Sequence, residues 1–208
     1  MHPALPGGSA LAVALALATA AAVPSAFAEG PLLLRIGGHN VAPKSDNGEL
    51  AGGALAVDVE SRPGVTFNVG WYFTPHVALD VLAALPFEHD IRLNGVKAGS
   101  ARQLPPTVSV QYHFMPSRRF DPFVSAGINY TTFWDTKLDD GTPLDLDDSW
   151  GLAAQAGVDY TLDAARRWVV GADIRYIDID TEASSDGTGL GTVEIDPLAY
   201  GMTVGYRF

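Results

Sequence analysis

Apolar residues alternate with small or polar residues through most of the chain, and this pattern constrains the fold more than any other sequence feature. In one stretch Val77, Leu79 and Val81 alternate with Ala78 and Asp80. Alternation over about four to eight residues is typical of a β-strand with one apolar face. The stretches that share the pattern are Leu32–Ile36, Val65–Phe73, Val77–Leu85, Val108–Phe114, Val124–Tyr130, Leu152–Tyr160, Trp168–Tyr176 and Leu198–Phe208. We therefore expect an all-β chain of eight strands.

The connections between these strands alternate in length. Short ones fall at 74–76, 116–121 and 163–166, and long ones at 42–62, 88–103, 135–148 and 181–192. This alternation is typical of a transmembrane β-barrel with short periplasmic turns and long extracellular loops. After residue 30, no apolar run reaches the ~18 residues that a membrane-spanning helix requires.

Two kinds of barrel fit the alternation, and the two faces distinguish them. A soluble barrel of the lipocalin type has its apolar face inside, whereas a membrane barrel has it outside. The apolar face here contains no charged residue, and Lys44, Lys97 and Lys137 all fall in expected loops. Aromatic residues gather near the expected strand ends, as in interfacial girdles: Trp71, Tyr72, Phe73, Phe133, Trp134, Trp150, Tyr160, Trp168 and Tyr176. We expect an eight-stranded antiparallel transmembrane β-barrel in the cell outer membrane.

The beginning of the chain has a different composition. Residues 1–28 contain no Lys, Arg, Asp or Glu, an apolar run extends from Ala10 to Val23, and Ala26-Phe27-Ala28 forms an A-x-A pattern. These features predict a secretory signal peptide over 1–28 that is cleaved after Ala28, which leaves one barrel domain over 29–208. An uncleaved membrane anchor is the alternative, although the apolar run is short for a span.

Composition and motifs exclude several classes of function. The net charge is −11, whereas nucleic-acid binding needs a basic face, so no nucleic-acid partner is expected. The absence of cysteine excludes disulfides and zinc–thiolate sites. No G-x-S-x-G motif is present, and the five histidines show no metal-ligand spacing. We therefore expect neither an enzyme nor a metal or cofactor.

If the apolar face meets lipid, the opposite face lines the interior of the barrel. The residues that we expect to line the lumen are Arg35, Asp80, Leu82, Gln111, His113, Asp159, Asp173, Arg175 and Arg207, with His39, Asn129 and Gln155 on the same face. Charges in a low-dielectric interior must pair, and both signs are present. They form either a structural network that fills a narrow barrel or a polar path and binding site. Leu82 is then either a hydrophobic constriction or a space-filling residue.

Two charged surface features bear on contacts with the membrane. The third long loop is acidic and is either simply solvated or bridged by divalent cations to anionic lipopolysaccharide. Its acidic residues are Asp135, Asp139, Asp140, Asp145, Asp147 and Asp148. The arginine pairs Arg118–Arg119 and Arg166–Arg167 fall in short turns, where they can contact phospholipid headgroups. Outer-membrane lipids and lipopolysaccharide are thus expected partners.

A series of motifs runs in order along nearly the whole chain after residue 30. They are Leu104–Thr107, Gln111–Phe114, Gly127–Phe133, Asp148–Gly151, Ala156–Tyr160, Tyr176–Thr181, Asp196–Pro197 and Gly205–Phe208. With these motifs the chain resembles the OmpW family of Gram-negative outer-membrane proteins. The resemblance implies an eight-stranded barrel that takes up small hydrophobic molecules, in a family also associated with stress responses and with phage or colicin binding.

The resemblance also assigns roles to individual residues. Tyr206 and Phe208 resemble the C-terminal signature that the barrel-assembly machinery reads. Leu82 falls where the family has an apolar constriction, but its usual aromatic counterpart aligns with Arg175, so a purely apolar interior is not expected. The first long loop, at 42–62, is rich in Gly and small residues, so the apolar entry groove of the family is not evident there. The expected function is a narrow conduit or binding site for small, mostly hydrophobic molecules, and the alternative is a non-transporting structural or surface-receptor barrel.

Overall fold

The computed structural model describes residues 30–208, which form fifteen β-strands. The predicted signal peptide, residues 1–28, lies outside the described residues and stays a prediction. Within 30–208 no helix is long and apolar enough to cross a membrane. Eight strands form the barrel wall: β1 (Leu32–Ala42), β4 (Arg62–Tyr72), β5 (Val77–Ala84), β8 (Thr107–His113), β9 (Phe120–Leu138), β11 (Ser149–Thr161), β12 (Trp168–Ile177) and β15 (Leu198–Arg207).

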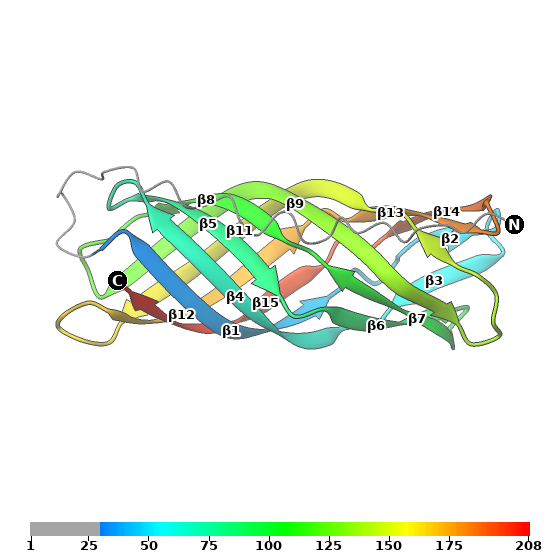
Figure 1. Cartoon of the computed structure of the whole chain (residues 1–208), viewed down its shortest axis with the longest axis horizontal. Helices are drawn as coiled ribbons and strands as arrows, with labels where there is room; N and C mark the ends of the chain where they lie inside the picture. Colours follow the sequence, from blue (N-terminus) through cyan, green and yellow to red (C-terminus); the bar gives the residue numbers. More distant parts are fainter. Residues whose placement is uncertain (1–29) are drawn as a thin grey trace, which may run out of the picture.

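Antiparallel pairing joins these eight strands into a closed cylinder (Figure 1). Each strand pairs with the next one in this series. Finally β1 pairs with β15, from Leu33 opposite Arg207 to Ala42 opposite Leu198, and closes the ring. A closed sheet leaves no unpaired edge in lipid. The prediction of an eight-stranded antiparallel barrel is confirmed.

Apolar side chains cover the outside of the wall. Ile36, Val110, Ile128 and Met202, which come from four different strands, are 52–67% exposed. The residues between them face inward and are mostly small or polar, with a few large apolar side chains such as Leu33 and Phe123. An apolar outer belt around a polar interior is the arrangement that lipid requires, because the bilayer core solvates hydrocarbon and not charge. We call this surface the lipid belt.

Aromatic side chains gather at both ends of the lipid belt. Near the C-terminus, the Tyr206 ring packs edge to face against Trp168 and Phe208, with centroids 5.1 and 4.9 Å apart. Toward the other end, Tyr130 packs on Trp150 with centroids 4.7 Å apart. These rings suit the two membrane–water interfaces, where an apolar ring with a polar edge is most stable.

The long connections are folded. They contain seven further strands that extend the cylinder beyond the lipid belt, at the right of Figure 1. These are β2 (Glu49–Leu50), β3 (Leu55–Val59), β6 (Phe87–Leu93), β7 (Val96–Leu104), β10 (Asp145–Leu146), β13 (Asp180–Ser185) and β14 (Thr188–Glu194). The β6–β7 hairpin pairs with the upper part of β9, and β13 and β14 form a second hairpin. We call this region the extracellular tier.

The facing of the side chains shifts by one residue where β5 passes into β6. Asp80 and Leu82 of β5 are buried inside the barrel, whereas in β6 the buried residues are the odd-numbered Phe87 and His89. Pro86 stands between the two strands and lacks the N–H that a regular ladder needs. The outward residues of β6 are Glu88, Asp90 and Arg92. Charged side chains cannot face lipid, so this outward surface must meet water. We therefore place β6 above the lipid belt, in the extracellular tier.

Candidate functional site

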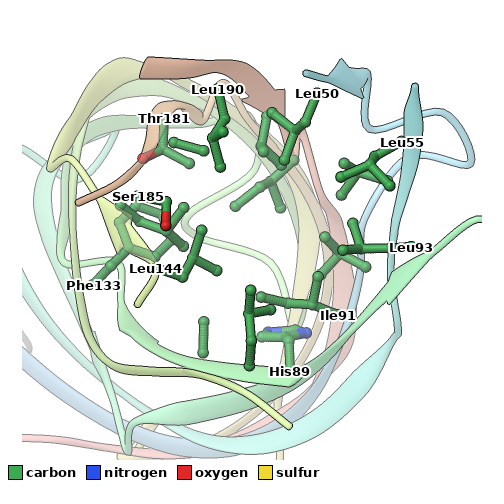
Figure 2. A pocket seen from close by; sticks show the side chains of 18 of the residues that line it. Leu50, Leu55, His89, Ile91, Leu93, Phe133, Leu144, Thr181, Ser185 and Leu190 are labelled. Atoms are coloured by element: carbon green, nitrogen blue, oxygen red, sulfur yellow. The ribbon is translucent and has the colours of Figure 1, made fainter. Parts of the chain in front are cut away.

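A cavity of about 380 Å³ lies inside the extracellular tier (Figure 2). Its lining is mainly apolar and includes Leu50, Leu55, Val57, Ile91, Leu93, Phe133, Leu144, Leu190, Val193 and Ile195. The exposed residues Asp140 and Thr142 also border it, so the cavity reaches the extracellular surface. Concave apolar sites of about 300–1,000 Å³ are typical of small-molecule binding.

The first long loop supplies a large part of this lining. Leu50 of β2 and Val57 of β3 are buried in the apolar cluster around the cavity, and Leu55 packs against it. Gly52 (φ 67°) and Gly53 (φ 93°) make the tight turn between these strands. The apolar surface that was not evident from the sequence of this loop is present, because its glycines form the turn while its leucines and valines line the cavity.

Phe133 also lines the cavity, although the sequence placed it in an aromatic girdle. The strand β9 runs for 19 residues to Leu138, well beyond the lipid belt. Phe133 lies on the same inward face as the buried Asn129 and Thr131. The girdle assignment of Phe133 is therefore wrong, since a strand of this length carries its inward side chains into the extracellular tier.

Paired charges fill the lumen of the barrel on the periplasmic side of this cavity. Arg35 Nη2 donates a hydrogen bond to Asp159 Oδ2 at 2.5 Å, and Arg35 Nη1 lies 3.7 Å from Asp80 Oδ1. Asn68 Nδ2 donates to the second oxygen of Asp80 at 2.7 Å. All four side chains are buried. A buried charge is tolerated only when it is paired in this way.

Arg175 and Asp173 belong to a second charged group. Arg175 Nη2 lies 3.8 Å from Asp173 Oδ1, which also accepts a hydrogen bond from Gln155 Nε2 at 2.8 Å. His39 Nε2 lies 3.0 Å from Asp173 Oδ2, and its Nδ1 lies 2.8 Å from the Thr66 hydroxyl. Because a carboxylate only accepts, His39 donates from Nε2. Both oxygens of Asp173 therefore accept a hydrogen bond, one from Gln155 and one from His39.

Leu82 is buried beside this charged layer. Together with Phe87, Gln103 and Arg175 it borders a smaller, mostly apolar cavity. Gln103 borders the large cavity as well. Leu82 therefore stands between the apolar cavity of the extracellular tier and the charged interior of the barrel.

The periplasmic half of the lumen is filled too. His113 Nδ1 donates to Asp121 Oδ2 at 2.8 Å, and its Nε2 lies 3.1 Å from the Tyr72 hydroxyl. Gln111 is buried beside them, and the Arg207 guanidinium lies over the Tyr72 ring at 4.3 Å. Tyr72 is 1% exposed, so its assignment to an aromatic girdle is wrong. Arg35, Asp80 and Asp159 form one group of polar contacts, whereas Gln111, His113, Asp173 and Arg175 belong to a second group that is joined through Gln155.

The polar side chains of the lining include His89 of β6 and Gln103 of β7, which contact each other. His89 Nδ1 lies 2.7 Å from the Glu60 carbonyl, and His89 Nε2 lies 3.0 Å from Gln103 Nε2. Burial lowers the pKa of His89, with a smaller opposing effect of the hydrogen bond to Glu60. The ring is therefore neutral at neutral pH. Neither residue was predicted from the sequence to lie in a site, although the alternation of His89 with Ile91 and of Gln103 with Ala101 indicates a shared face.

An acidic cluster on the extracellular tier was also missed, because its members come from separate segments. Carboxylate oxygens of Asp178, Asp180 and Asp196 lie within 4.8 Å of one another. Burial, together with Asp196 and Asp178, raises the pKa of Asp180. Lys44 Nζ lies 3.1 Å from Asp196 Oδ2 and also contacts Glu194, so an ammonium already offsets part of the negative charge.

A closed barrel with a lipid belt, a filled polar lumen and an apolar cavity at its extracellular end defines a small transmembrane β-barrel protein of the outer membrane. Sequence comparison identifies the family within this class of protein. The chain belongs to the OmpW family, whose family model matches residues 28–208.

Named relatives and solved structures agree with this assignment. Outer membrane protein W of Vibrio cholerae serotype O1 is 36% identical over 95% of this chain and 97% of its own length. The crystal structure of the outer membrane protein OprG from Pseudomonas aeruginosa matches with a TM-score of 0.76 and 30% identity, over 86% of this chain and 97% of that one. A more distant relative is the dibenzothiophene metabolism operon protein PahQ of Pseudomonas aeruginosa, 26% identical over 90% of this chain and 93% of its own length.

Proposed function

We propose that this barrel is a narrow conduit for small, mostly hydrophobic molecules and carries out no catalytic step. The observation that carries the proposal is the apolar cavity at the extracellular surface. An apolar solute gains about 25 cal/mol for each Å² that it buries there. The relative PahQ, named for a dibenzothiophene metabolism operon, supports this substrate class, because dibenzothiophene is an apolar aromatic compound.

The filled lumen argues against an exit straight through the barrel. A solute on that path would have to separate the Arg35–Asp159 and Arg175–Asp173 pairs, and an apolar solute offers them no replacement partner. An exit through the wall at the outer edge of the lipid belt requires no such separation. We therefore propose that the solute leaves the cavity sideways.

The wall beside the cavity has a seam between β4 and β6. The ladder between β4 and β5 ends above Thr66, where Leu85 N donates to Val65 O at 3.0 Å. Pro63 and Pro86 follow on the two sides, and neither can donate a backbone hydrogen bond. In the described part of the chain, β4 and β6 form no ladder with each other.

Side chains hold this seam together. Arg62 on β4 forms an ion pair with Asp90 on β6 and lies 3.5 Å from Glu60. Phe87 packs on Gly64 so closely that a Cβ there would lie 2.0 Å from its ring. Exposed ion pairs contribute only about 0–1 kcal/mol each, so the seam opens at a lower cost than a paired ladder.

Uptake of a hydrophobic probe tests the conduit. N-phenyl-1-naphthylamine fluoresces in the cell envelope and crosses an intact outer membrane slowly. Cells of a Gram-negative host that express this barrel should take it up several times faster than cells with an empty vector. If cells with the folded barrel take up the probe no faster than cells with an empty vector, the conduit is contradicted. The alternative is then a structural or receptor barrel that transports nothing, which the filled lumen favours.

A crosslink across the seam tests the exit. The native chain has no cysteine, so Arg62→Cys with Asp90→Cys gives one defined pair for a short bifunctional thiol reagent. The matched control is Glu88→Cys with Arg102→Cys, which replaces an ion pair between two directly paired residues of the β6–β7 hairpin. Crosslinking should lower probe uptake at the seam and leave it unchanged at the hairpin. Unchanged uptake with a crosslinked seam would reject the sideways exit.

We also propose that the barrel contacts phospholipids, lipopolysaccharide and the barrel-assembly machinery of the cell envelope. Arg166 donates hydrogen bonds to the carbonyls of Pro116 and Ser117, which ties two periplasmic turns together. The arginines of these turns suit phospholipid headgroups. The acidic extracellular loop suits cation bridges to lipopolysaccharide, and the aromatic C-terminus with Phe208 suits recognition by the barrel-assembly machinery.

A further inference from the structure

The hydrogen bonds of His89 fix which of its ring nitrogens carries the proton. Its Nδ1 lies 2.7 Å from the Glu60 carbonyl oxygen, which can only accept, so Nδ1 donates. In the neutral ring, Nε2 is then an acceptor. Its neighbour at 3.0 Å is Gln103 Nε2, and an amide NH₂ is a donor. The contacts are consistent with a single arrangement of protons.

This arrangement also fixes the orientation of the Gln103 amide. If the amide turned by half a rotation, its Oε1 would face the lone pair of His89 Nε2, and two acceptors would meet. The amide therefore keeps its NH₂ toward His89 and its oxygen away from the ring. Gln103 is 2% exposed, and Oε1 has no hydrogen-bond partner among residues 30–208.

The surroundings of Gln103 are apolar. It borders both the large cavity and the smaller one beside Leu82. The other polar side chains of the large cavity are hydrogen-bonded or exposed: Thr181 donates to Asp147 O at 2.6 Å, Ser185 donates to Pro143 O at 2.7 Å, and Asp140 and Thr142 are exposed. A buried oxygen without a partner costs free energy, which a donor group on a ligand would recover.

We propose that Gln103 Oε1 accepts a hydrogen bond from the ligand, so that the cavity takes small apolar molecules with one hydroxyl donor, such as phenols or aliphatic alcohols, in preference to the parent hydrocarbons. This inference rests on the proposed function and names the substrate class of the same cavity. His89 is a positioning residue, because it acts only through the orientation of the Gln103 amide.

Three probes of similar shape separate donor recognition from general polarity. 1-Naphthol has a hydroxyl donor, 1-methoxynaphthalene has only an acceptor, and naphthalene has neither. Equilibrium dialysis against the full chain in lipid nanodiscs, with empty nanodiscs subtracted, gives the affinity of each probe. We expect 1-naphthol to bind roughly three- to tenfold more tightly than the other two, the factor of one net hydrogen bond.

The variant Gln103→Met removes the acceptor and keeps the length of the side chain. It should abolish the preference for 1-naphthol and leave naphthalene binding intact. The control Leu152→Met introduces the same residue on the lipid belt, where Leu152 is 69% exposed, and should keep the preference. Folding of each variant is checked by its shift in electrophoretic mobility on heating.

The outcomes separate this inference from the proposed function. If all three probes bind the unaltered chain equally, or if Gln103→Met keeps the 1-naphthol preference, the inference is wrong and the cavity still binds apolar molecules. If no probe binds above empty nanodiscs, the proposed function itself fails. If Gln103→Met does not fold, the ranking of the three probes on the unaltered chain decides.

Discussion

Arg35 and Asp159 meet across the lumen, although 124 residues separate them in the chain and two strands separate them in the wall. Their hydrogen bond of 2.5 Å joins β1 to β11 through the centre of the barrel. Asp80 approaches the same guanidinium from β5. One arginine therefore ties three parts of the wall together, and the lumen at this level is a structural element.

Removal of this arginine should destabilise the barrel strongly. Arg35→Ala leaves Asp159 and Asp80 buried without their cation, and breaking a buried pair in this way costs about 3–5 kcal/mol. Urea unfolding in lipid vesicles measures the free energy of unfolding. The control Arg62→Ala, which breaks an exposed pair, should cost less than about 1 kcal/mol. Similar losses for both variants would show that the Arg35 network is hydrated and contributes little.

A charge on the lipid belt should be costly. Ile128 is 53% exposed on the outer surface of β9, and Ile128→Arg should lower the free energy of unfolding in lipid by about 2–4 kcal/mol. Val96 is 69% exposed at the start of β7, above the belt, so Val96→Arg should be nearly neutral. Urea unfolding in lipid vesicles measures the free energy of unfolding of both variants. Equal costs would mean that the in/out assignment of the wall is wrong.

The extracellular tier should loosen in mild acid through His89. Burial lowers the pKa of His89, so the unfolded chain binds a proton more readily than the folded chain. The stability from the neutral ring is complete above the ordinary pKa of about 6.5 and is lost as pH falls from there through the folded-state pKa. Arg62 opposes protonation and Asp90 favours it. Hydrogen exchange of the β6–β7 amides, corrected for intrinsic rates, should therefore be faster at about pH 5 than at about pH 7.5.

A variant isolates the role of His89 in this change. His89→Phe has no group that titrates in the window and should show no difference in corrected exchange between the two pH values. Asp90 does not interfere, because its hydrogen bond to Lys97 lowers its pKa and keeps it ionised throughout. Amides of β12, inside the lipid belt, serve as the internal reference. A pH effect that persists in His89→Phe would assign it to another group.

Deletion of Phe208 should impair assembly more than stability. Phe208 is 59% exposed and contacts Tyr206 at the end of the last strand, so its loss removes little buried surface. The assembled fraction in cells should fall, while refolding of purified protein in detergent should change little. Normal assembly in cells without Phe208 would remove its assigned role as an assembly signal.

The wall could be predicted from the sequence because lipid imposes a simple rule. Charges are excluded from the outer surface, so alternation alone assigned Arg35 and Asp159 to the interior. Their contact could not be predicted, because the residues that meet across a lumen depend on the stagger of all eight strands at closure. The alternation along a strand shows whether a residue faces inward or outward, but it does not show how high the residue lies along the barrel axis.

The cavity was harder to predict, because its strands follow the opposite rule. Above the lipid belt the surroundings are water, so apolar residues such as Val57 and Ile91 face inward and charges face outward. The segments are short, and Gly52 and Gly53 made the first of them look like an irregular loop. The contact between His89 and Gln103 depends on the shift at Pro86, which a continuous alternation does not reveal.

The shift at Pro86 has a consequence for how this family can change length in evolution. One residue inserted or deleted there would turn Glu88 and Asp90 into the cavity and expose Phe87 and His89 to water. An insertion or deletion of two residues would keep each β6 side chain on its present face and change only the height of the strand in the barrel. At the Asn94–Gly95 turn, where both residues have positive φ, a length change alters only the tip of the hairpin. Gaps in alignments of related barrels should therefore come in pairs near Pro86 and in any number at the hairpin tip.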